Sequence, residues 1–97
     1  RGLARRIVAE AGKNEPGPRI AYGFLLCTSR EATPGELERL VRFYREQRGG
    51  FLADPDAAKR VLKNESLSAE NGGQADLAAL VMVANVLLNL DETLTKE

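Results

Sequence analysis

The stretch that decides the fold is ADLAALVMVANVLLNLDETL, residues 75–94, in which the apolar run over residues 77–90 is interrupted only by Asn85 and Asn89. Its length and composition predict a buried helix. The apolar part, residues 77–90, is shorter than the roughly 20 residues that a membrane span needs. We therefore predict no membrane span, and we expect the remainder of the chain to pack around this helix.

Two helices are predicted in the first third of the chain. Residues 2–11 carry apolar side chains at helical spacing, and Gly12 follows where a left-handed C-terminal cap is expected. The lysine, asparagine and proline cluster at residues 13–18 predicts a loop. A second helix is expected to begin at Pro18 or Arg19 and to end near residue 30, because proline suits the first helical position.

Two more helices have clear start signals. The sequence TPGE at residues 33–36 is typical of a capping box, with proline at the first helical position. We expect Gly49-Gly50 to loosen that helix. Asp54-Pro55 then predicts a new start, with a short helix over residues 55–63. Residues 64–73 are polar, small and glycine-ended, which predicts a surface loop.

These features together predict an all-α fold. No segment alternates apolar and polar residues as a strand would, and no internal repeat is visible. The 97 residues are one domain's worth of chain. We expect a single domain over residues 1–97, a compact bundle of four to five helices around the hydrophobic C-terminal helix. The chain starts without methionine, and we interpret it as a fragment of a larger protein.

The charge balance argues against partners that are recognised through a strong electric field. Fourteen basic and fourteen acidic side chains cancel, so nothing steers the chain toward nucleic acid or an anionic membrane. The arginines of the predicted third helix are interleaved with glutamates, which is typical of a solvated face. A nucleic-acid-binding surface on these arginines stays open as an alternative, although we predict no nucleic-acid partner.

The titratable residues exclude several site chemistries. Histidine is absent and Cys27 is the single cysteine, so the usual ligand sets for zinc, copper or haem and the Ser-His or Cys-His nucleophiles are missing. Cys27 follows Phe24, Leu25 and Leu26, and we expect it to be a small buried hydrophobe among them. We predict no catalytic, cofactor-binding or metal-binding residue in this domain.

One stripe of the C-terminal helix is a candidate contact site. At about 100° per residue, Asn85, Asn89 and Glu92 share one side with Ala78 and Lys96, and Asp91 points away from it. Buried amides without partners would cost on the order of 1–3 kcal/mol each. Either these side chains bond a loop or another helix, or they contact another part of the parent protein or a ligand.

Two stretches resemble a known family. They are SREATPGELERL, residues 29–40, and VANVLLNLDETLTKE, residues 83–97, preceded by ADLAAL. Both are similar to the C-terminal domain of large planctomycete proteins of unknown function. Residues 86–92 match the family's ending, and the other stretch matches at Arg30, Thr33, Pro34, Glu36 and Leu37. The family's usual tryptophan, phenylalanine and arginine are replaced by Leu80, Thr93 and Lys96.

The resemblance implies a location and a set of partners. Family members carry export signals, which implies an extracytoplasmic protein, periplasmic or secreted. They pair this domain with an upstream cytochrome-linked domain, so other domains of the parent protein are the expected partners. The chain lacks a Cys-x-x-Cys-His sequence, so haem would belong to another part of the parent.

The leading functional prediction is a non-catalytic helical terminal module that packs against or docks other domains of a large exported protein. The candidate interdomain contact is Asn85, Asn89 and Glu92. One alternative is part of an enzyme that acts on extracellular polysaccharide or in haem-linked redox chemistry, with Asp91 and Glu92 as contributing carboxylates. The second alternative is the nucleic-acid-binding helical domain. The oligomeric state is not predicted.

Overall fold

Five helices make up the part of the chain that the computed structural model describes, which is residues 3–10, 15–65, 67 and 73–96, with the side chains of the last helix up to Asn89. In chain order they are α1 (Leu3–Glu10), α2 (Pro16–Thr28), α3 (Pro34–Ala53), α4 (Pro55–Asn64) and α5 (Gln74–Lys96). No residue in these described ranges lies in a strand. The predicted all-α bundle is confirmed.

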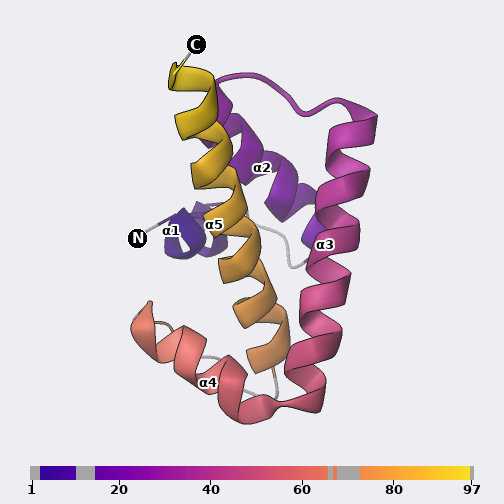
Figure 1. Cartoon of the computed structure of the whole chain (residues 1–97), viewed down its shortest axis with the longest axis vertical. Coiled ribbons are helices and arrows are strands. Elements are labelled where there is room, and N and C mark those ends of the chain that lie inside the picture. The colour runs from indigo at the N-terminus through magenta and orange to yellow at the C-terminus, as the bar shows by residue number, and fades with distance from the viewer. Residues whose placement is uncertain (1–2, 11–14, 66, 68–72, 97) are drawn as a thin grey trace.

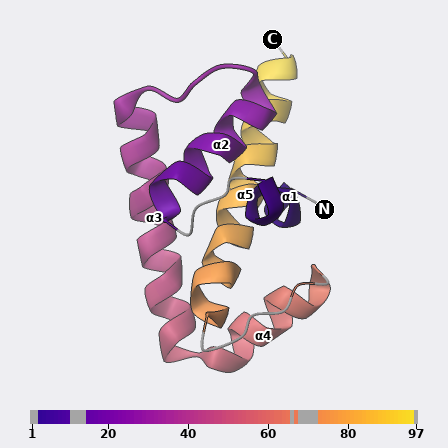
Figure 2. The ribbon, with the colours of Figure 1, turned by 180° about the vertical axis from the view of Figure 1, so that it is seen from behind.

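The C-terminal helix α5 is the element that all the others contact (Figure 1). It runs beside α3 in the opposite direction, and α4 packs against its first turns. The view from behind shows α2 lying across α3 and α5, with α1 beside it against α5 on the same face (Figure 2). Most of its apolar residues up to Leu87 belong to the core. The largest fully buried side chains come from α1, α2 and α5; they are Ile7, Ile20, Phe24, Leu80, Val83 and Leu87.

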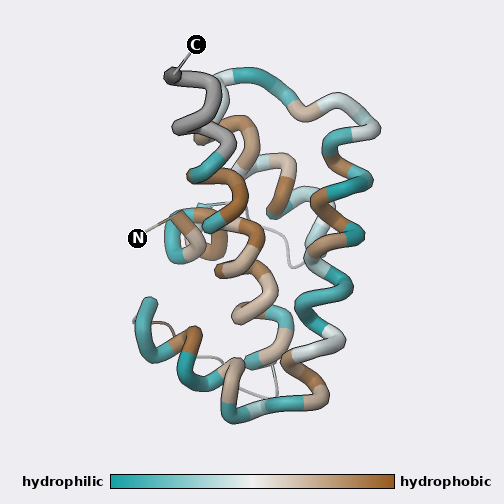
Figure 3. The backbone as a smooth tube through the Cα atoms, viewed as in Figure 1, coloured by the Kyte–Doolittle hydropathy of each residue, from teal (hydrophilic) through white to brown (hydrophobic). Residues whose placement is uncertain are grey.

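The hydropathy of the backbone follows this arrangement (Figure 3). The described part of α5 is apolar along most of its length, whereas α3 and α4 alternate apolar and polar turns because only one side of each helix faces the core. No helix in the described ranges has the length and apolar character required to cross a membrane. The burial of most apolar residues of α5 up to Leu87 confirms the prediction that it is a core helix.

The two predicted start signals in the middle of the chain are confirmed. The hydroxyl of Thr33 accepts a hydrogen bond from the N–H of Glu36 at 3.2 Å, and the Glu36 carboxylate accepts one from the N–H of Thr33 at 2.9 Å. The carboxylate of Asp54 accepts the N–H of Ala57 at 3.3 Å, and Pro55 takes the first position of α4. Each cap satisfies N–H groups that have no partner inside the helix.

The predicted start of the second helix, at Pro18 or Arg19, was two or three residues late. α2 begins at Pro16, after Glu15 in extended conformation, and the Glu15 carbonyl accepts the N–H of Arg19 at 3.3 Å. Pro18 fits into this first turn because the first N–H groups of a helix have no intrahelical acceptor, so its missing donor costs nothing there. The loop predicted over residues 13–18 is therefore wrong for residues 16 and 17, and residues 13 and 14 lie outside the described ranges.

The predicted loosening at Gly49-Gly50 was wrong. α3 continues through both glycines to Ala53, and the N–H of Asp54 still donates to the Gly50 carbonyl at 3.0 Å. The reason is tertiary, because Phe51 follows the glycines and is buried in the core. Packing of this ring holds the last turn of α3 helical in spite of the poor helix propensity of glycine.

The burial predicted for Cys27 among its apolar neighbours also needs correction. Cys27 is half-buried rather than fully buried, and its neighbour Leu25 is 41% exposed. Leu25 lies about 140° around the helix from Ile20 and about 100° from Phe24, which places it on the outer side of α2. The predicted cap at Gly12 and most of the loop at residues 64–73 lie outside the described residues.

Candidate functional site

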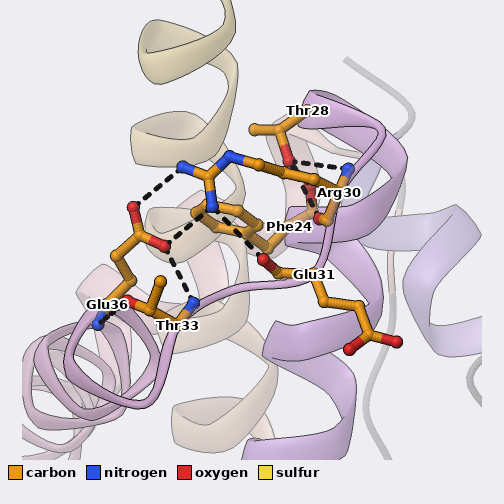
Figure 4. Close-up of polar contacts among 6 residues, drawn as sticks. All are labelled: Phe24, Thr28, Arg30, Glu31, Thr33 and Glu36. Carbon is orange, nitrogen blue, oxygen red and sulfur yellow. Dashed lines mark hydrogen bonds and ion pairs between the residues drawn. The ribbon is translucent and has the colours of Figure 1, made fainter.

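The densest group of polar contacts joins the end of α2 to the start of α3 (Figure 4). The guanidinium of Arg30 donates two hydrogen bonds to the Glu36 carboxylate, from Nη1 at 3.0 Å and from Nη2 at 2.9 Å. Nη1 also donates to the Glu31 carbonyl at 3.2 Å. The Arg30 guanidinium carbon lies 4.9 Å from the centroid of the Phe24 ring. This is a bidentate ion pair stacked on a buried aromatic ring.

The electrostatics of this joint favour the charged forms of both partners. The hydrogen bonds from Arg30, followed by that from the Thr33 backbone, lower the pKa of the Glu36 carboxyl from 4.5 to about 2. In return, the hydrogen bond to Glu36 raises the pKa of Arg30. The Glu36 carboxylate therefore serves the helix cap and the ion pair together, and it is occupied by structural partners.

The turn before α3 is shaped by two further residues. Ser29 ends α2 in the left-handed conformation, with φ of 62°, and its N–H donates to the Leu25 carbonyl at 2.9 Å. The hydroxyl of Thr28 donates to the Phe24 carbonyl at 2.8 Å. Serine tolerates this positive φ less readily than glycine does, and the surrounding bonds hold the turn in place.

Two other polar contacts also tie helices together. The guanidinium of Arg48 on α3 donates to the Asp76 carboxylate on α5, and the hydroxyl of Tyr22 on α2 donates to the Glu10 carboxylate on α1. The hydrogen bond to Glu10 raises the pKa of Tyr22 and lowers the pKa of Glu10. These two contacts hold α3 against α5 and α2 against α1, so the charged groups that take part in them stabilise the fold.

The predicted contact stripe lies on one side of the second half of α5. Asn85 and Asn89 are exposed, and Leu88 between them is 37% exposed. Leu87, on the opposite side of α5, is fully buried toward α2, where a Cβ at Gly23 would lie 3.0 Å from its Cδ1 atom. The structure thus brings Asn85 and Asn89 to one exposed face. Because these amides remain in contact with solvent, the energetic cost of burying a polar group does not arise for them.

Two acidic residues near the end of α5 follow its last described side chain. Asp91 and Glu92 continue the helix, and their side chains lie outside the described part of the structure. Within the ranges that the structure describes, no three His, Cys, Asp or Glu side chains are grouped as a metal site would need. The enzyme alternative, which depended on Asp91 and Glu92, stays a prediction.

Sequence reasoning missed the Arg30–Glu36 pair. It named Arg30 and Glu36 among the residues that match the family stretch and placed Glu36 in the capping box, but it did not pair the two charges. The signal was present as opposite charges six residues apart around a capping box. Whether such a pair forms depends on the turn between them, and the left-handed Ser29 is not predicted by any local pattern.

Two shallow grooves lie on the outer sides of α2 and α3. The groove on α3 has a volume of about 490 Å³ and is lined by Pro34, Leu37, Glu38, Val41, Arg42 and Arg45. The groove on α2 has a volume of about 350 Å³ and is lined by Pro18, Ala21, Tyr22, Leu25, Glu31 and Ala32. The α3 groove combines apolar and charged side chains of both signs.

Comparison of the chain with known proteins finds no match to a protein-family model, to a curated protein or to a solved structure. The planctomycete resemblance therefore stays a prediction. The residues of its first stretch, Arg30, Thr33, Pro34, Glu36 and Leu37, lie together at the joint between α2 and α3.

Proposed function

We propose that this chain is a non-catalytic helical module that docks another domain of a larger exported protein through one face of α5. We name this surface the α5 docking face; its described residues are Asn85, Leu88 and Asn89, and Glu92 comes next on the same side of the helix. The partner is a domain of the same parent protein, as the family resemblance implies.

The observation that supports this proposal is the unequal burial of α5 along a single side. Ala78 and Asn85 are seven residues apart and therefore point in nearly the same direction. Ala78 is 0% exposed, whereas Asn85 is exposed. The first half of α5 is covered on this side, and the described part of the second half is open.

The chemistry of the docking face suits a protein surface better than a small ligand. Carboxamides both donate and accept hydrogen bonds, so Asn85 and Asn89 can bond backbone groups of a partner. Leu88 adds an apolar side chain between them. Interfaces commonly combine a few apolar anchors with a hydrogen-bonding rim.

The direct test measures whether Leu88 is covered in the natural protein. Leu88→Cys is introduced together with Cys27→Ser, and maleimide labelling is timed in the 97-residue chain and in the full-length natural protein. Leu25→Cys in the same background is the matched control, because Leu25 is 41% exposed on the outer side of α2. Cysteine at position 88 is expected to label at least tenfold more slowly in the full-length protein.

The control cysteine at position 25 is expected to label at the same rate in both proteins. Equal labelling of position 88 in both proteins would overturn the proposal. So would a natural protein that contains nothing beyond these 97 residues. Circular dichroism of each cysteine variant checks that the helical fold is retained before labelling rates are compared.

A further inference from the structure

The outer side of α3 carries a second surface, separate from the α5 docking face. Pro34, Glu38, Val41 and Arg45 follow one another at intervals of four, three and four residues, which places them within about 60° of one another around the helix. We name this set the α3 stripe. It lines the groove of about 490 Å³ together with Leu37 and Arg42.

The spacing of the α3 stripe is that of a helix–helix seam. Residues that alternate intervals of three and four remain on one side of a helix and pack against a partner helix. α3 has 20 residues, which corresponds to a length of about 30 Å at 1.5 Å per residue. Val41 within the stripe and Leu37 beside it are half-buried and pack partly against the core of their own chain. The exposed parts of these two side chains provide the apolar contact that such a seam requires.

The charges of the α3 stripe are complementary to those of the same stripe on a second copy of the chain. Glu38 lies three residues before Val41, and Arg45 lies three residues after Arg42, so the two charges are symmetric about the midpoint between residues 41 and 42. When two α3 helices are placed antiparallel about that midpoint, each Glu38 faces the Arg45 of the other copy. The antiparallel arrangement also opposes the two helix dipoles favourably.

Neither charged group is strongly held within its own chain. The Glu38 carboxylate lies 3.8 Å from the Arg42 guanidinium, and both side chains are at least 70% exposed. Such exposed surface pairs contribute little to stability. Arg45 forms no ion pair with any residue in the described part of the chain. Both groups are therefore available to a second molecule.

From these observations we propose that the α3 stripe is a self-association surface, on which a second copy of this chain packs its own α3 antiparallel with reciprocal Glu38–Arg45 ion pairs. A single helix face is smaller than the roughly 1,200 Å² that stable protein–protein interfaces bury in total. The dimer is accordingly weak and reversible, and it forms as the protein concentration rises.

Sedimentation equilibrium of the chain, from low micromolar to near-millimolar concentration, tests the proposal. The unmodified chain is expected to show a monomer–dimer equilibrium. Glu38→Arg and Arg45→Glu each place like charges opposite one another at both symmetric contacts, so each variant is expected to weaken the dimer by about tenfold or more. Arg39→Glu, on another side of α3, is the control and is expected to leave the dimer unchanged.

Restoring the charge complementarity provides the decisive measurement. The double variant Glu38→Arg, Arg45→Glu recreates both ion pairs with reversed sign and is expected to recover the dimer. An equimolar mixture of the two single variants also recreates both pairs, in a heterodimer, and needs no doubly substituted chain to fold. A monomer at every concentration would overturn the proposal, and so would a mixture that associates no better than either variant alone.

Discussion

Replacing Gly49 and Gly50 by alanine is expected to stabilise the protein, because both glycines lie inside α3 where no structural role requires a glycine. A Cβ atom built at either position meets no heavy atom within 4 Å. Both residues are exposed, and neither has a positive φ. The added methyl group therefore enters open space at both positions. The effect of each substitution on the free energy of unfolding then comes only from the difference in helix propensity between glycine and alanine.

The size of this effect follows from helix propensity. Glycine in a helix interior is less favourable than alanine by about 0.5–1 kcal/mol, because the unfolded glycine backbone has more conformational freedom to lose. No steric cost offsets this gain here, so the double variant is expected to gain about 1–2 kcal/mol in free energy of unfolding. For a domain of this size, each 1 kcal/mol raises Tm by about 4–8 °C.

The assay is urea unfolding followed by circular dichroism, with Gly23→Ala as the control. A Cβ at Gly23 would lie 2.6 Å from the Cδ1 atom of Ile7 and 3.0 Å from that of Leu87, and both side chains are fully buried. Overpacking there costs about 1–3 kcal/mol, which cancels or exceeds the propensity gain. A loss of stability in the Gly49→Ala, Gly50→Ala variant would show that α3 bends at the glycines and would refute the reasoning.

Three further predictions follow from the structure. Leu87→Ala is expected to cost about 2–5 kcal/mol because it opens a cavity in the core, whereas Leu88→Ala, one residue later and 37% exposed, is expected to cost well under half of that in the same denaturant assay. The pKa of the Glu36 carboxyl is lowered from 4.5 to about 2 in the folded state, so its contribution to stability is complete above pH 4.5 and is lost as the pH falls toward 2. Urea unfolding across this window should show that the difference in free energy of unfolding between the unmodified chain and Glu36→Gln decreases as the pH falls. A difference that stays constant would contradict the ion pair. Duplex DNA titrated at low salt is expected to show no binding by fluorescence anisotropy, because the acidic and basic side chains cancel; binding that weakens with salt would restore the nucleic-acid alternative.

The local signals of the sequence predicted most of the helices. The capping box at residues 33–36 and the aspartate-proline start at residues 54–55 each depend on contacts within one helical turn, and such contacts form independently of the remainder of the fold. The apolar run of α5 also predicts its own burial, since no other arrangement removes so many apolar side chains from water.

The failures occur where packing overrides a local preference. Gly49-Gly50 has low helix propensity, yet burial of Phe51 keeps α3 continuous through it. Leu25 is apolar, yet its side chain is 41% exposed on the outer side of α2. Neither result follows from the neighbouring residues, because each depends on which elements lie beside the helix in space.

For the candidate site, too, some features follow from the sequence and others only from the tertiary structure. The sequence by itself determined that the chain is a helical domain without histidine, that α5 is its core helix, and that Asn85 and Asn89 share one side of it, because helix periodicity and residue type suffice for each point. Only the tertiary structure decided that Ala78 is covered on this side while Asn85 is exposed, and that Arg30 reaches Glu36 across the turn between α2 and α3. Burial and long-range ion pairing are properties of how helices pack against one another, and a periodicity within one helix carries no information about its neighbours.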